Sequence, residues 1–286
     1  MIHIAIFFQQ LIASLTHIIA KGVTNDVSPV MVLFFRAFIA SMVYFIYLLF
    51  RKSGFKKIEN KDWWLIFVLG LLNIPINQFF FLVGVSFTTA PNVSLAYALT
   101  PIFVFIVAAI FYKEKVNTKK IMGIILAVGG AVVLLSEKGF SFTSDSLKGD
   151  ILALLASLSW GLYTIIGRDF SRKYGAIYST FLSMAAGFIL YIPVFLSFEH
   201  EYNVSEITFA NWLQILYLGA ITSGLGYALW FYALKKIEAS KLSVFNNFQP
   251  ALTAILAFLI FGTGISLYFL VGGTLIIAGV FITQRG

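Results

Sequence analysis

Apolar runs long enough to cross a membrane alternate along the chain with short polar segments. A spanning helix needs about 20 mainly apolar residues, and hydrocarbon offers no hydrogen-bond partner to an unpaired backbone. Each run is therefore predicted to be a helix. The ten predicted spans, numbered in chain order, cover residues 3–21, 30–50, 63–84, 91–112, 119–136, 150–168, 176–197, 212–234, 241–261 and 265–283.

The composition leaves little room for anything besides these spans. Only 11% of the 286 residues are charged, whereas 60% are hydrophobic. An ordinary globular domain carries about 25% charged residues. Ten spans would occupy roughly 200 positions, so no soluble domain is expected. We predict an all-α integral membrane protein.

The basic residues predict how the spans are oriented, because Lys and Arg are retained on the cytoplasmic side of a membrane. Sixteen of the 20 Lys and Arg residues lie in five alternate segments, which are 51–61, 113–120, 168–173, 235–241 and the C-terminal Arg285. This distribution predicts a multi-pass protein of the inner (cytoplasmic) membrane with both termini cytoplasmic. A nucleic-acid partner is not expected, since the basic residues are spread over short loops and not gathered on one face.

The chain repeats itself at a shift of 149 residues. The matched pairs are Gly70 with Gly219, Ala90 with Ala239, Ser94 with Ser243, Pro101 with Pro250, Gly123 with Gly272 and Gly130 with Gly279. The repeat predicts two halves, residues 1–140 and 141–286, of five spans each. Because five is odd, the second half must enter the membrane from the opposite side. Inverted repeats of this kind are typical of secondary transporters with a binding site near the bilayer midplane.

Several motifs resemble those of the EamA-type branch of the drug/metabolite transporter superfamily. They are Ser159-Trp160-Gly161 in span six, Arg36 early in span two, Ala-x-x-x-Ser leading to Pro in spans four and nine, and Lys113-Glu114 after span four. The resemblance covers essentially the whole chain. It implies a ten-helix exporter or exchanger of small metabolites, including amino acids, while some members carry nucleotide sugars or sugar phosphates. One departure is Thr263, the repeat partner of Glu114, where the family usually has Glu.

Spans three and eight carry a stripe of polar and aromatic residues. Asn73, Asn77 and Phe81 follow one another at intervals of four and share a helical face. The alternative role for such residues is hydrogen bonding between helices, but the stripe occurs in both repeats, so we predict a central substrate cavity. The full predicted lining consists of His17, Asn73, Asn77, Gln78, Phe81, Tyr97, Trp160, Tyr163, Tyr227, Trp230 and Asn246.

Arg36 and His17 are the only ionisable Arg, Lys, His, Asp or Glu residues well inside the predicted spans. The guanidinium of Arg36 either holds a carboxylate or phosphate of the cargo or has a structural role at the end of its helix. Proton pumps commonly use buried carboxylates or His chains, so facilitated movement or exchange is favoured over strict proton coupling. Aromatic walls with a few amides and hydroxyls suit a neutral or zwitterionic cargo with apolar parts.

Prolines and glycines recur at matched places in the two halves. Pro101 and Pro250 each predict a kink, because proline removes a backbone hydrogen bond, and we interpret them as a gating pair. The glycines of spans five and ten recur seven residues apart, so each pair shares a helical face. Small residues allow close helix packing in lipid, which predicts a scaffold or a homodimer contact through spans five and ten.

We therefore predict a secondary transporter that exports amino acids or related metabolites by alternating access or facilitated exchange. The alternatives are a membrane-embedded enzyme acting on a lipid-linked substrate, a passive channel, and a transporter of nucleotide sugars or sugar phosphates. An enzyme would need buried acid and base groups within mutual reach. The sequence has no phosphate-binding loop, no metal-spaced ligand set and no nucleophile elbow. No cofactor, metal or enzymatic activity is expected.

Overall fold

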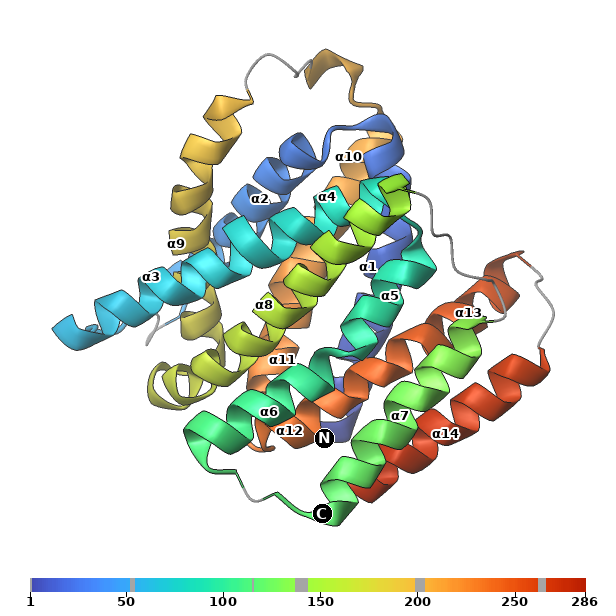
Figure 1. The fold of residues 1–286 in the computed structure, drawn as a ribbon. Coiled ribbons are helices and arrows are strands. Elements are labelled where there is room, and N and C mark those ends of the chain that lie inside the picture. Colours follow the sequence, from blue (N-terminus) through green and yellow to red (C-terminus); the bar gives the residue numbers. More distant parts are fainter. Residues whose placement is uncertain (1, 52–54, 115, 137–143, 199–203, 262–265) are drawn as a thin grey trace.

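The computed structural model describes residues 2–51, 55–114, 116–136, 144–198, 204–261 and 266–286, and within these ranges every regular element is a helix. The elements in chain order are α1 (Ile2–Asp26), α2 (Pro29–Leu49), η1 (Asn60–Asp62), α3 (Trp63–Leu71), η2 (Leu72–Gln78), α4 (Phe79–Phe87), α5 (Ala90–Ala98), α6 (Thr100–Tyr112), α7 (Thr118–Ser136), α8 (Ser144–Tyr174), α9 (Ala176–Ser197), η4 (Val204–Glu206), α10 (Phe209–Leu216), η5 (Tyr217–Gly226), α11 (Tyr227–Leu234), α12 (Ala239–Ser243), η6 (Val244–Asn247), α13 (Phe248–Phe261) and α14 (Leu267–Gln284). Figure 1 shows these helices gathered into one bundle, with α7 and α14 paired along one flank.

The helices coincide with the ten predicted spans. Spans three, four, eight and nine are each built from consecutive helical pieces, whereas the others are single helices. Among the described residues, seven helices are long and apolar enough to cross a membrane, namely Ile2–Asp26, Pro29–Leu49, Asn60–Phe87, Asn92–Tyr112, Ser146–Tyr174, Ala176–Ser197 and Phe209–Leu234. The predicted all-α, multi-pass membrane architecture is confirmed.

Four spans are interrupted, at matching places in the two halves. The η2 segment of span three and the η5 segment of span eight are π-helical. Span four breaks at Leu99, between α5 and α6, and the 3₁₀ segment η6 interrupts span nine. Pro101 and Pro250 each lie in the first turn of the helix that follows the interruption. A missing N–H is tolerated there, because the first turn of a helix has no partner for it.

Individual residues set where some of these helices begin and end. Lys113 adopts a left-handed conformation, with φ of 50°, directly after α6. Gly175, with φ of 96°, permits the sharp turn between α8 and α9, a conformation that glycine adopts without steric cost. Before α10, the Thr208 hydroxyl accepts a hydrogen bond from the backbone N–H of Asn211, and the Asn211 side chain accepts one from the backbone N–H of Thr208. These caps satisfy groups that the helix leaves unpaired.

Contacts between the two halves come in matched pairs. Span one packs on span eight (α1 with η5 and α11), and span six packs on span three (α8 with η2 and α4). Span one also packs on span nine (α1 with α13), and span six on span four (α8 with α5 and α6). The contact of α2 with η5 has its counterpart in the contact of α9 with α3. These helix pairings therefore recur when each helix is replaced by its repeat partner in the sequence.

The glycines of α7 and α14 face each other within the chain. A Cβ atom built on Gly123 would lie 2.6 Å from the carbonyl oxygen of Gly279, and one built on Gly130 would lie 2.7 Å from that of Gly272. The two backbones are thus in direct contact along this seam, as small residues allow in lipid. A homodimer through spans five and ten stays a prediction, and it would have to use their other faces.

The predicted cytoplasmic segments meet at one end of the bundle, where both chain termini also lie (Figure 1). Lys173 Nζ lies 2.6 Å from carboxylate oxygens of Glu59 and Asp62, which joins segment 168–173 to segment 51–61. Lys120 Nζ lies 2.6 Å from Glu238, which joins segment 113–120 to segment 235–241. Since these segments are far apart in sequence, their gathering at one end agrees with the charge pattern.

Candidate functional site

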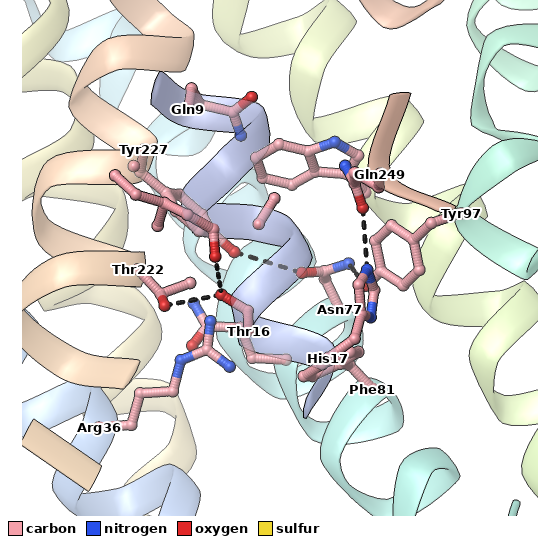
Figure 2. A pocket seen from close by; sticks show the side chains of 15 residues that line it. Gln9, Thr16, His17, Arg36, Asn77, Phe81, Tyr97, Thr222, Tyr227 and Gln249 are labelled. Atoms are coloured by element: carbon pink, nitrogen blue, oxygen red, sulfur yellow. Dashed lines mark hydrogen bonds between the residues drawn. The ribbon is translucent and has the colours of Figure 1, made fainter. Parts of the chain in front are cut away.

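A cavity of about 60 Å³ lies between the two halves of the bundle. It is bounded by α1, α2, η2, α4, α5, α8, η5, α11 and α13, and Figure 2 shows its polar side chains pointing toward one another. The lining residues are Gln9, Ile12, Ala13, Thr16, His17, Arg36, Asn77, Gln78, Phe81, Tyr97, Trp160, Thr222, Gly226, Tyr227 and Gln249. All four interrupted spans place a lining residue at or within two residues of the interruption, namely Asn77 in η2, Thr222 in η5, Gln249 just after η6 and Tyr97 just before Leu99.

The α1 face of the cavity is built by residues spaced three and four apart. Gln9, Ile12, Ala13 and Thr16 follow the i, i+3, i+4, i+7 pattern that puts side chains on one side of a helix. The Thr16 hydroxyl lies 2.8 Å from the carbonyl oxygen of Ile12 and 2.8 Å from the hydroxyl of Thr222. Because the Thr16 proton goes to the carbonyl, the Thr222 hydroxyl is the donor of the second bond. This bond joins span one to span eight.

His17 is held by two side-chain amides in series, Gln249 of span nine and Gln10 of span one. Its Nε2 atom lies 2.8 Å from Oε1 of Gln249, and the Gln249 amide nitrogen donates to Oε1 of Gln10 at 3.0 Å. Since an amide oxygen only accepts, His17 donates through Nε2. Its Nδ1 atom has no hydrogen-bond partner among the described residues, so one acceptor of the ring is unused. The network joins α1 to α13 across the two halves.

Asn77 is the polar centre of span three. Its amide nitrogen donates to the Tyr97 hydroxyl at 2.8 Å and to the carbonyl oxygen of Ala156 at 2.7 Å. Its amide oxygen accepts from the Tyr227 hydroxyl at 3.4 Å. One side chain therefore links spans three, four, six and eight at the cavity.

Arg36 is buried in the cavity wall, with 3% of its surface exposed. Its Nε atom donates to the Ser223 hydroxyl at 2.9 Å, and its guanidinium carbon lies 5.9 Å from the centre of the Phe81 ring. The guanidinium points into the cavity (Figure 2), and its Nη1 atom has no hydrogen-bond partner in the described part of the chain.

Aromatic rings form two further patches of the wall. The Trp160 ring packs against Tyr227 with a centroid distance of 4.9 Å. On the other side, the His17 ring lies 5.6 Å from Phe81 and 5.7 Å from Tyr97. The site thus combines flat apolar surfaces with a small set of amides, hydroxyls and one cation.

Eight of the predicted site residues line the cavity, and they are His17, Arg36, Asn77, Gln78, Phe81, Tyr97, Trp160 and Tyr227. The predicted kinks at Pro101 and Pro250 coincide with helix interruptions next to the cavity, and their role as a gating pair stays a prediction. The departure at Thr263 lies outside the described residues.

Four predicted residues lie behind the wall and do not line the cavity. Asn73 lies against α9, where its amide nitrogen donates to Sδ of Met184 at 3.3 Å, and its amide oxygen accepts from Gln78 at 2.9 Å. The other three are tied to neighbouring side chains, and they are Tyr163 with Ser183 at 2.6 Å, Trp230 with Thr164 at 3.1 Å, and Asn246 with Gln10 at 3.2 Å. They support the lining from outside.

The lining residues outside the predicted set are Gln9, Ile12, Ala13, Thr16, Thr222, Gly226 and Gln249. A signal was present in span one, where Gln9 and Thr16 are polar and share the helical spacing of Ile12 and Ala13. Thr222 and Gly226 are the repeat partners of Asn73 and Asn77, so the repeat also pointed to them.

The sequence matches the model of the EamA-like transporter family over residues 1–136 and again over residues 147–285. "Uncharacterized transporter YyaM" of Bacillus subtilis (strain 168) is 30% identical over 271 residues, which cover 94% of this chain and 88% of that protein. An "Uncharacterized transporter" of Archaeoglobus fulgidus is 28% identical, over 98% of this chain and 96% of its own.

A solved crystal structure has the same fold, with a TM-score of 0.79 over 99% of this chain and 96% of the other, at 20% sequence identity. At that identity the likeness speaks for the fold alone. The family match covers nearly all of the sequence, in agreement with the helical bundle and its central cavity. The chain therefore belongs to the EamA-like transporter family, within the drug/metabolite transporter superfamily, and is a multi-pass membrane transporter.

Proposed function

We propose that this protein is a secondary transporter that exports amino acids or related small metabolites across the inner membrane by alternating access. The observation that carries the proposal is that both halves line one polar cavity beside the interruptions of spans three, four, eight and nine. A helix that is already interrupted can bend there without losing further backbone hydrogen bonds. The walls of the cavity are thus the parts of the bundle best able to move.

The matched contacts between the halves support an inverted repeat. The helix pairings between the halves have counterparts with the halves exchanged, so a second conformation that differs by this exchange would use the same kinds of helix contact. An inverted pair of five-span halves would convert such an exchange into opening on alternate sides of the membrane. The cavity between the halves would then face each side in turn.

The chemistry of the lining supports amino acids and related compounds as cargo. Amides and hydroxyls such as Asn77 and Thr16 offer hydrogen bonds to polar groups, while the rings of Trp160 and Tyr227 suit an apolar side chain. The direction of transport is proposed from the exporters among the family that the motifs resemble. The inner-membrane location and the cytoplasmic termini are proposed from the basic segments.

Counterflow in liposomes tests the function. Vesicles containing the purified protein and preloaded with unlabelled leucine are expected to take up labelled leucine saturably. Ala13→Trp, which fills the cavity, is expected to abolish this uptake, whereas Ile125→Trp, on an exposed apolar surface, leaves it unchanged. Chemical conversion of the substrate would indicate an enzyme, and an unsaturable flux would indicate a channel.

The topology has a separate test. The chain has no cysteine, so the single variants Lys57→Cys and Lys236→Cys each carry one thiol for an impermeant reagent. Both are expected to be labelled from the same side of the membrane. Labelling from opposite sides would overturn the inverted five-plus-five arrangement.

A further inference from the structure

Among the residues that the structure describes, the charge of Arg36 has no counter-ion. An arginine stays protonated in proteins, so the guanidinium is a full positive charge that is 3% exposed at the depth of the membrane spans. No Asp or Glu is among the lining residues that the structure describes, and the side chain donates to the Ser223 hydroxyl and packs on the Phe81 ring. Both contacts are neutral groups, which leave the charge uncompensated.

An uncompensated buried charge is costly, and buried charges in membrane proteins usually mark a ligand or ion pathway. The guanidinium has five N–H donors in a planar fork. Here it points into the cavity (Figure 2), and its Nη1 atom has no hydrogen-bond partner among the described residues. A fork with free donors matches the two oxygens of a carboxylate. The missing counter-charge is thus supplied most directly by the cargo.

One guanidinium balances one negative charge. No Lys and no second Arg lines the cavity among the described residues, so a doubly charged phosphate ester would remain half uncompensated in the same low-dielectric space. The free acceptors of the lining, Oε1 of Gln78 and Nδ1 of His17, are neutral and add no second cation. They can accept from an ammonium or hydroxyl of the cargo without being required for charge balance.

We propose that the cavity selects cargo that carries a single carboxylate, bound by the guanidinium of Arg36, and that an ammonium group on the cargo is dispensable for binding. This inference rests on the proposed function and sharpens its substrate class from amino acids to monocarboxylates with an apolar side chain. The Phe81 ring beside the guanidinium and the Trp160 ring across the cavity receive the apolar part.

Four probes of one carbon skeleton separate the two charged groups. They are L-leucine, with both groups, 4-methylpentanoate, with the carboxylate alone, L-leucinamide, with the ammonium alone, and 4-methyl-1-pentanol, with neither. In thermal unfolding of the purified protein at constant chloride, a ligand of the folded state raises the melting temperature. Leucine and 4-methylpentanoate are expected to raise it, and the other two to leave it unchanged. Inorganic phosphate serves as the dianion and is expected to have no effect.

Two variants assign the effect to Arg36. Arg36→Gln is expected to weaken the binding of 4-methylpentanoate about 10- to 100-fold, the usual worth of a hydrogen bond to a charged group. Arg172→Gln, at an exposed arginine outside the cavity, leaves binding unchanged. Arg36→Lys keeps the positive charge but lacks the planar fork of donors. It is expected to bind 4-methylpentanoate more weakly than the unmodified protein and more tightly than Arg36→Gln. The probe series on the unmodified protein tests the proposal even where a variant fails to fold.

The outcomes for the two proposals differ. If leucinamide binds or exchanges as well as leucine, or if Arg36→Gln keeps the preference for carboxylates, the monocarboxylate inference is wrong while amino-acid transport stands. If 4-methylpentanoate fails where leucine succeeds, the ammonium is required and the inference is again wrong. If none of the probes binds or moves in liposomes, the proposed amino-acid cargo itself is wrong.

Discussion

The Nη1 atom of Arg168 lies 2.8 Å from Oε1 of Glu114, and this ion pair joins span six of the second half to the end of span four of the first. The other carboxylate oxygen of Glu114 accepts from the Ser240 hydroxyl at 2.5 Å. The guanidinium of Arg168 also packs on the ring of Tyr112, 4.8 Å from its centre. Both ionic side chains are largely buried, so polar contacts between the halves close the end of the bundle where the basic segments meet.

Replacing Glu114 with Gln is expected to loosen this closure. The neutral amide weakens the contact with Arg168, at a cost of about 1–3 kcal/mol for a hydrogen bond between charged groups. A single thiol at the cavity, introduced as Thr16→Cys, is expected to react faster with a reagent added at the basic end when Gln replaces Glu114. Asp169→Asn is the control, because Asp169 also contacts Arg168 but is 58% exposed. Equal thiol reactivity in both backgrounds would show that the ion pair does not hold the bundle closed.

Pro101→Ala and Pro250→Ala are expected to slow transport without unfolding the protein. Alanine supplies the missing N–H and favours a continuous helix, which stiffens the interruption beside the cavity. A rise of only about 1.4 kcal/mol in the barrier slows exchange about tenfold. Counterflow measures the rate, and circular dichroism and thermal unfolding check the fold. Pro193→Ala, inside α9 and away from the cavity lining, should exchange normally, and a similar loss in that variant would argue against a gating role.

Gly130→Ala is expected to lower the free energy of unfolding, whereas Gly129→Ala is expected to leave it unchanged or raise it. A methyl group at Gly130 would lie 2.7 Å from the carbonyl oxygen of Gly272, whereas one at Gly129 would meet nothing within 4 Å. The first forces α7 and α14 apart, at a cost of about 1–3 kcal/mol. The second is neutral or stabilising by up to about 1 kcal/mol, because alanine favours helix over glycine. Thermal unfolding in detergent compares the two, and equal melting temperatures would contradict the close packing of these helices.

Glu238 is expected to make the loop between spans eight and nine sensitive to acid. The hydrogen bond from Lys120 Nζ, at 2.6 Å, holds the pKa of the Glu238 carboxyl below its ordinary value of 4.5. Because the folded pKa is the lower one, the ion pair stabilises the fold above about pH 4.5, and this stabilisation is lost as the pH falls through the folded pKa. The melting temperatures of the unmodified protein and of Glu238→Gln should therefore converge in acid. A difference that stays constant with pH would contradict this linkage.

Local sequence patterns were sufficient to predict much of the architecture. Apolar runs predicted the ten spans, since hydrocarbon admits little besides continuous helices, and the basic segments predicted which loops share one end of the bundle. Repeat matching, helical spacing, the family motifs and the scarcity of ionisable residues inside the spans together pointed to eight cavity residues, among them Asn77 and Arg36. The same spacing also predicted Asn73, which the structure places against Met184 of α9, because helical spacing shows which residues share a face but not which neighbouring helix that face meets.

The sequence by itself determined the membrane-spanning helices, their likeness to a transporter family and the scarcity of charge inside the bundle, because these depend on residues close together in the chain. The tertiary structure alone decided which groups meet. His17 and Gln249 are 232 residues apart, and Arg36 and Ser223 are 187 apart, yet each pair is in hydrogen-bond contact. That Arg36 has no counter-ion within the described part of the chain could be seen only in the structure, because the helices that pack around a charge decide whether it is paired.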